Sequence, residues 1–255
     1  MSSTRTEKIK FKNSSGFLLD ARLDLPADTP TPGTYAIFCH CFTCTKETIT
    51  TFRISRLLAQ HGIACLRFDF TGLGNSEGDF ANTNFTTMVD DILAAATYLS
   101  DHHEAPEFLL GHSMGGTAAL VASLRLDNIH GIVTIASPSK PDHVLHHLGQ
   151  DLALLEQNKP VSFNVAGQLY PMNPQFLNDV RHFDPKKLFG GIDKPVLIFN
   201  VKHDEMVSPD DAEEINRWVK GSSEIIMLET ADHLLSDRSD TNSVVDEIIQ
   251  WTSNL

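Results

Sequence analysis

The stretch that most constrains the fold of this chain runs from Glu107 to Leu120 and reads EFLLGHSMGGTAAL. Residues 108–110 form a short apolar run that predicts a buried strand, and residues 117–122 are good helix formers. Between them a G-x-S-x-G motif predicts a sharp turn with Ser113 at its apex. A strand and a helix that meet closely at a strained turn leave no room for a Cβ, so a glycine is expected on each side of the serine. The first turn of the helix would direct its backbone N–H groups at Ser113.

A second G-x-S-x-G motif occurs at residues 74–78, with Ser76 at its centre. It leads into Asp79–Asn82, so no helix begins directly after it, and the motif predicts a loop. We therefore take Ser113 as the candidate nucleophile, because the strand–turn–helix order occurs there. Asp69 and Ser76 are expected to fix the turn around the second motif instead of taking part in chemistry.

The charge balance excludes several kinds of partner. The net charge of −13 makes nucleic acid and anionic membrane surfaces poor partners. No apolar run approaches the roughly 18 residues that a membrane span needs, and residues 1–13 lack the apolar core of a signal peptide. Three of the four cysteines crowd into residues 39–44, which is not the pattern of a secreted disulfide framework. These features predict a cytoplasmic protein with no nucleic-acid or membrane partner.

Strands and helices are expected to alternate along most of the chain. Two alternating segments around a turn predict an antiparallel pair, and the later apolar runs predict buried strands separated by amphipathic helices. The expected strands are 7–12, 17–25, 35–39, 63–68, 108–110, 129–136, 195–201 and 224–228; the expected helices are 47–60, 84–100, 117–122, 210–219 and 243–252. This order predicts an α/β fold, with a mostly parallel eight-stranded sheet that has helices on both faces.

Residues 137–190 lose this rhythm and are rich in His, Pro and Asn. We expect residues 1–255 to form one domain in which 137–190 is a lid inserted at the carboxyl edge of the sheet. The lid carries apolar residues that would serve either substrate binding or packing within the lid itself: Phe163, Leu169, Tyr170, Met172, Phe176 and Leu177.

A serine hydroxyl needs a base, and the base needs an acid that orients it. In a parallel sheet such groups gather at the carboxyl ends of strands. The strand 195–201 leads into Asp204, and the strand 224–228 leads into His233. The order Ser113, Asp204, His233 is the one expected of a nucleophile elbow on such a sheet. Glu205 and Asp210 are alternative acids, whereas His203 is too close to Asp204 in sequence to act as the base.

Two backbone N–H groups are needed to stabilise the negative oxygen of a tetrahedral intermediate. One is expected from Met114, which follows the nucleophile, and the other from the loop after the third strand. We assign the second donor to Phe42 within the segment Cys39–Cys44.

Two clusters could be metal sites instead. Cys39, His40, Cys41 and Cys44 offer zinc ligands, but neighbours at a strand end point to opposite faces and should not converge. A redox-sensitive Cys41 or Cys44 stays an alternative. His143 and His147 have i, i+4 spacing without the glutamate of a metalloprotease motif, which favours a polar helix face. No metal or cofactor is expected.

Taken together, five motifs resemble the α/β-hydrolase superfamily: His40–Thr43, Asp69–Ser76, Gly111–Gly115, Asp204 and His233. The tract from Asp69 is similar to that of feruloyl and cinnamoyl esterase-like members, and the His-Cys-Phe-Thr-Cys run resembles bacterial hydrolases often fused to an OsmC-like domain. The resemblance implies Ser113 as nucleophile, Asp204 as acid, His233 as base, and Phe42 and Met114 as oxyanion donors. Much of the superfamily has glycine where this chain has Cys41.

The expected function is hydrolysis of small carboxylic esters through an acyl-enzyme intermediate. His40, Cys41 and Tyr170 are the candidate substrate-binding residues. Thioester or peptide cleavage, acyl transfer and perhydrolysis are alternatives on the same fold, and a catalytically idle binding module is an alternative of another class. The acyl group and the oligomeric state are not predicted.

Overall fold

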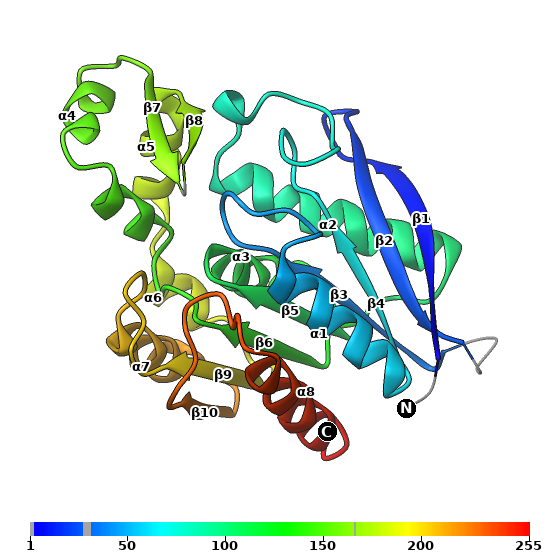
Figure 1. Ribbon diagram of the computed structural model, residues 1–255. Coiled ribbons are helices and arrows are strands. Elements are labelled where there is room, and N and C mark those ends of the chain that lie inside the picture. The colour runs from blue at the N-terminus through cyan, green and yellow to red at the C-terminus, as the bar shows by residue number, and fades with distance from the viewer. Residues whose placement is uncertain (1–2, 28–31, 166) are drawn as a thin grey trace.

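The computed structural model describes residues 3–27, 32–165 and 167–255, and it is built on one large sheet (Figure 1). The eight strands lie in the order β1-β2-β4-β3-β5-β6-β9-β10. The pairs β1–β2 and β2–β4 are antiparallel, and all other neighbours are parallel. Their bounds are β1 (Thr4–Lys12), β2 (Leu18–Pro26), β3 (Thr34–Cys39), β4 (Ile63–Phe68), β5 (Phe108–His112), β6 (Gly131–Ile135), β9 (Val196–Val201) and β10 (Ser223–Leu228). The predicted mostly parallel eight-stranded sheet is confirmed.

Two apolar cores lie on the two faces of the sheet, because successive strand residues point to opposite sides. In β3, Ile37 belongs to one core and Phe38 to the other; Leu109 and Leu110 of β5 divide in the same way. Figure 1 shows α1 and α8 in front of the sheet, with α2 and α3 behind it. The helices are α1 (Ile49–Gln60), α2 (Phe85–His102), α3 (Met114–Ser123), α7 (Pro209–Trp218) and α8 (Arg238–Thr252). Helices on both faces are therefore also confirmed.

The last helix begins five residues earlier than predicted. The expected start was residue 243, behind a Thr-Asn-Ser cluster that resembles a helix cap. The structure instead places the cap at Asp237, whose carboxylate accepts the Ser239 N–H. Thr241 is buried inside the helix, and its hydroxyl donates to the Arg238 carbonyl. The Thr-Asn-Ser cluster thus lies within the helix, because Asp237, which is closer to the preceding loop, caps its start.

The segment 137–190 is an insertion of short elements beyond the carboxyl ends of the parallel strands (Figure 1, upper left). The insertion contains a two-stranded sheet. Most apolar side chains of the insertion are buried, whereas Leu169 is 64% exposed. Its elements are η2 (Pro141–His147), α4 (Asp151–Glu156), β7 (Val161–Val165), β8 (Gln168–Met172), α5 (Pro174–His182) and α6 (Pro185–Phe189). A short 3-10 helix outside it, η1 (Phe80–Asn82), contacts β8. Each element is too short to produce a clear periodicity in the sequence.

Within the described part of the chain, no helix is both long enough and apolar enough to cross a membrane.

Candidate active site

Ser113 stands at the turn between β5 and α3 with a backbone φ of +53°, a conformation that non-glycine residues rarely adopt. The two flanking glycines are required by close packing. A Cβ on Gly111 would collide with the backbone of Gly115 and Gly116. A Cβ on Gly115 would collide with the backbone carbonyl of His40 at the end of β3. The predicted strand–turn–helix is confirmed, with α3 pressed against both β5 and the loop after β3.

Asp204 and His233 are brought together because β9 and β10 are parallel neighbours whose carboxyl ends share one edge of the sheet. The His233 Nδ1 lies 2.7 Å from Asp204 Oδ2, and the Asp204 side chain is 2% exposed. Asp204 Oδ1 also accepts the amide hydrogens of Met206 and Val207, at 2.7 and 3.0 Å. The alternative acids, Glu205 and Asp210, are exposed, as is His203.

The electrostatics of this pair favour an ionised acid. Burial alone would raise the pKa of Asp204, but the hydrogen bond and charge of His233 and the two loop amides lower the pKa below its ordinary value. An ionised Asp204 accepts the Nδ1–H of His233. The Nε2 of His233 is then the ring nitrogen that can take a proton.

His112, the residue before the nucleophile, holds the His233 loop beside the turn. Its Nε2–H donates to the His233 carbonyl at 2.7 Å, and the two ring centres are 4.9 Å apart. The Thr50 hydroxyl donates to the next carbonyl along the chain, that of Leu234.

In the described residues no hydrogen bond joins the Ser113 hydroxyl to His233. Such bonds are often long in proteins without substrate and shorten in the complex. The sequence did not reveal the role of His112, because nothing local distinguishes it from a core histidine.

Burial, together with the neighbouring His233, lowers the pKa of His112 to about 3. The unfolded chain therefore binds a proton between about pH 6.5 and pH 3 that the folded chain does not, and stability falls as the pH falls through this window. From about pH 7 to about pH 5, His112 should cost about 2 kcal/mol of unfolding free energy. Urea unfolding at both pH values should show that His112→Gln loses less unfolding free energy than the wild type does on going from about pH 7 to about pH 5. His130→Gln, which removes a histidine 63% exposed, should behave like the wild type. An equal loss in all three proteins would contradict this assignment.

The two proposed oxyanion donors lie where the loop after β3 meets the start of α3. Met114 is the first residue of α3, and an N–H group at this position has no acceptor within the helix. Phe42 lies in a turn that the Cys44 N–H closes onto the Cys41 carbonyl at 3.2 Å. Across the described residues, neither the Phe42 nor the Met114 amide donates to another protein group. Both are thus available to an external oxygen.

The cysteine cluster differs from what the sequence suggests. Cys41 and Cys44 form a disulfide within residues 40–46, the segment that carries Phe42 and that we call the proposed oxyanion loop. The sequence does not predict this bond, because the chain lacks the cysteine pattern of a secreted disulfide framework. Cys39 is buried in the core, and burial raises the pKa of its thiol far above the ordinary value. In the described residues no group of three or more His, Cys, Asp or Glu suits a metal ion. His143 Nε2 lies 2.6 Å from the carbonyl of Met206, so His143 contacts the loop that carries Asp204.

Of the three candidate substrate-binding residues, His40 and Cys41 belong to the proposed oxyanion loop, and Tyr170 contacts it. His40 is fully buried; its Nδ1–H donates to the Cys41 carbonyl at 2.7 Å and its Nε2 accepts the Phe70 N–H at 3.3 Å. Burial lowers the pKa of His40 to about 4, so the ring is neutral. Tyr170 donates its hydroxyl to the Thr43 carbonyl at 3.0 Å. The polar atoms of His40 and Tyr170 are therefore occupied by protein groups, and a role of these residues in substrate binding stays a prediction.

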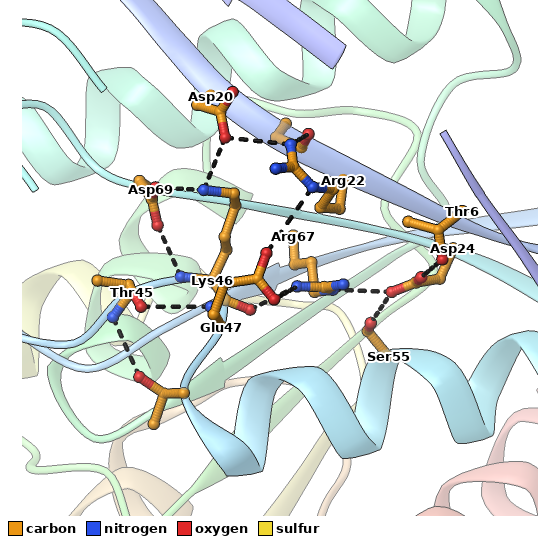
Figure 2. Close-up of polar contacts among 12 residues, drawn as sticks. Thr6, Asp20, Arg22, Asp24, Thr45, Lys46, Glu47, Ser55, Arg67 and Asp69 are labelled. Carbon is orange, nitrogen blue, oxygen red and sulfur yellow. Dashed lines mark hydrogen bonds and ion pairs between the residues drawn. The ribbon is translucent and has the colours of Figure 1, made fainter. Parts of the chain in front are cut away.

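A buried group of charges fixes the end of the proposed oxyanion loop at Lys46 (Figure 2). The Lys46 ammonium pairs with Asp69 and, at 2.7 Å, with Asp20, while the Lys46 N–H donates to Asp69 at 2.7 Å. Arg67 pairs with Asp24 at 2.8 Å and donates to the Lys46 carbonyl at 2.7 Å. The residues after Cys44 are thus fixed to the core of the sheet.

Asp69 also accepts the Asn75 N–H, and the Ser76 hydroxyl donates to the Asp69 carbonyl. The predicted role of Asp69 and Ser76 in fixing this turn is confirmed. Lys46 and Arg67 were missed, because each has a partner, Asp20 or Asp24, on β2, which is distant in the sequence.

Comparison with known proteins identifies the family and the fold. The family model described as serine aminopeptidase, S33 matches residues 37–173, more than half of the chain. The chain is 24% identical over 205 residues to the mitochondrial palmitoyl-protein thioesterase ABHD10 of Rattus norvegicus, covering 76% of this chain and 68% of that protein.

Two solved structures are similar over nearly their whole length. The esterase domain of a Rhodothermus marinus protein has a TM-score of 0.79 and 33% identity, and 97% of each chain is covered. Est1E of Butyrivibrio proteoclasticus with bound ferulic acid has a TM-score of 0.80 and 20% identity over 96% of this chain and 98% of that chain, a likeness that speaks for the fold alone. The chain therefore belongs to the serine aminopeptidase S33 family of hydrolases, within the α/β-hydrolase superfamily.

Proposed function

We propose that this protein is a serine hydrolase that cleaves small carboxylic esters through an acyl-enzyme intermediate. The observation that carries the proposal is the 2.7 Å contact between Asp204 and His233, which the His112 hydrogen bond places beside the Ser113 turn. The acid and the base thus lie at the edge of the sheet beside the turn that carries the Ser113 hydroxyl, which supports the arrangement that nucleophilic catalysis requires.

In the first half of the reaction Ser113 Oγ attacks the acyl carbon while His233 Nε2 takes the hydroxyl proton. Asp204 stabilises the resulting imidazolium, and the Phe42 and Met114 amides donate to the carbonyl oxygen as it becomes negative. His233 then gives its proton to the leaving alcohol. In the second half, water loses a proton to His233 and attacks the acyl-serine, which releases the carboxylic acid and restores the hydroxyl.

Thioester cleavage is the second candidate, and the similarity to a palmitoyl-protein thioesterase favours it. The same groups would act, because a thioester also passes through a tetrahedral intermediate at its carbonyl carbon. The leaving thiolate needs less help from a general acid than an alkoxide does. The proposed machinery therefore accommodates both reactions, and only substrate comparison separates them.

We further propose that residues 1–255 act as one domain and that 137–190 covers the site as a lid. The insertion contributes Tyr170 and several buried aromatic rings at the oxyanion loop. A cytoplasmic location stays a prediction, whereas the similar ABHD10 proteins carry a mitochondrial name.

The proposal is tested with matched oxygen and sulfur esters. Acyl chains of increasing length, with a feruloyl ester beside them, should be assayed as alkyl esters and as the corresponding alkyl thioesters, with Ser113→Ala as the background. We expect kcat/KM for at least one ester to exceed this background by about 10⁴-fold or more. A preference for thioesters across the series would favour the second candidate. Turnover equal to the background with every substrate would refute both.

A further inference from the structure

The proposed oxyanion loop is fixed at both ends and by a disulfide, and the insertion adds a further contact. His40 at the start of the loop and Lys46 at its end are buried and bonded to the core. Between them, the disulfide of Cys41 and Cys44 closes the turn that carries Phe42. The remaining contacts of this turn are made by residues outside the sheet core.

Tyr170 of β8 makes the polar contact between the insertion and this turn. Its hydroxyl donates to the carbonyl of Thr43, the residue after Phe42, at 3.0 Å. Among the described residues, no other side chain of the insertion hydrogen-bonds to residues 41–44. The Thr43 carbonyl shares its peptide with the Cys44 N–H, which donates to the Cys41 carbonyl at 3.2 Å, and that carbonyl shares its peptide with the Phe42 N–H. Through these two peptides, the orientation of the Phe42 donor depends on a hydroxyl that lies 127 residues later in the chain than Thr43.

Aromatic packing reinforces the same contact. The Phe42 ring lies 5.3 Å from the ring of Phe80, 6.0 Å from that of Phe163 and 5.1 Å from that of Phe176, measured between centroids. Tyr170 packs against two of these rings, at 5.4 Å from Phe80 and 5.9 Å from Phe163. The side chain of Phe42 is therefore embedded between η1, β7 and α5, while Tyr170 holds the neighbouring carbonyl.

We propose that Tyr170 is a positioning residue for the proposed oxyanion hole, through which the insertion sets the direction of the Phe42 N–H. This inference rests on the proposed function of Phe42. A misplacement of about 1 Å at a reacting group can cost about 10²-fold in rate, and a lost oxyanion donor costs about 10²–10³-fold. Loss of the Tyr170 hydroxyl would change the direction of the Phe42 N–H without removing it. The rate should therefore fall by less than it does when an oxyanion donor is lost.

The test is Tyr170→Phe, which keeps the aromatic ring and removes the hydroxyl. We expect kcat to fall about 10-fold with KM within about twofold of wild type, because the contact affects the oxyanion and not the bound ester. Binding of a trifluoromethyl ketone that forms a tetrahedral adduct should weaken by about the same factor. Tm should change by no more than about 4 °C, since one hydrogen bond is lost. Gln168→Ala, on the same strand and exposed, is the matched control and should leave kcat unchanged.

The outcomes separate this inference from the proposed function. If the wild type turns over esters through Ser113 and Tyr170→Phe is indistinguishable from it, the positioning role is wrong and the function stands. If KM rises and kcat is unchanged, Tyr170 binds substrate and the inference is also wrong. If the wild type has no Ser113-dependent turnover, the proposed function itself fails.

Discussion

Replacing Ser113 with alanine is expected to lower kcat for an activated ester by about 10⁵-fold, and His233→Ala should have a similar effect. The double variant should be no slower than either single variant. Asp204 and His233 act only through the Ser113 oxygen, so removing the base after the nucleophile has gone costs nothing more. Steady-state rates of the three variants on one p-nitrophenyl ester provide the comparison.

The second G-x-S-x-G serine supplies the control for this prediction. Ser76→Ala should keep kcat within about twofold, because the Ser76 hydroxyl bonds to the Asp69 carbonyl and the Asp20 amide and takes no part in the chemistry. Losses that add up in the Ser113/His233 double variant would show that the two side chains act separately. That result would contradict a shared mechanism.

The largest expected effect on stability comes from Lys46→Met. Methionine preserves most of the side-chain volume but leaves the buried Asp69 carboxylate without its cation and Asp20 with Arg22 alone. Burial alone would raise the pKa of Asp20, and Lys46 lowers that pKa below its ordinary value, which indicates that the pair is ionised in the fold. Breaking a buried pair from one side costs about 3–5 kcal/mol. Urea unfolding near neutral pH should show a loss of unfolding free energy of this size.

Lys202→Met is the matched control for Lys46→Met. Lys202 pairs with Glu229 at 2.6 Å, but the two side chains are 48% and 62% exposed. An exposed pair contributes about 0–1 kcal/mol, so the control should unfold nearly like the wild type. Equal stability of the two lysine variants would mean that the buried network does not hold the oxyanion loop in place.

The parts of the fold that could be predicted are those whose cause is local in the sequence. The turn at Ser113 was predictable because two glycines are needed where α3 meets β5 and the β3 loop. Asp204 and His233 were predictable as candidates because each follows an apolar run long enough for a buried strand. The start of α8 was predicted too late, since two polar clusters compete as caps and only packing decides between them.

The parts that could not be predicted depend on contacts between distant segments. His112 supports the His233 loop across 121 residues, and Tyr170 bonds to Thr43 across 127. Tyr170 was expected near the site from its place in the insertion, but its hydroxyl faces the protein. The Cys41–Cys44 bond was missed because the chain lacks the spacing of a disulfide framework, although the two residues close a single turn.

The most direct measurement is to map where an activated fluorophosphonate reacts. The folded protein should be treated with the probe, digested, and analysed by peptide mass spectrometry. A phosphonylated Ser113 in the wild type is the predicted result, with labelling strongly slowed in His233→Ala, because only the base makes that hydroxyl reactive. A protein that turns over esters while the adduct appears on another residue, or while Ser113 stays unmodified, would contradict the account.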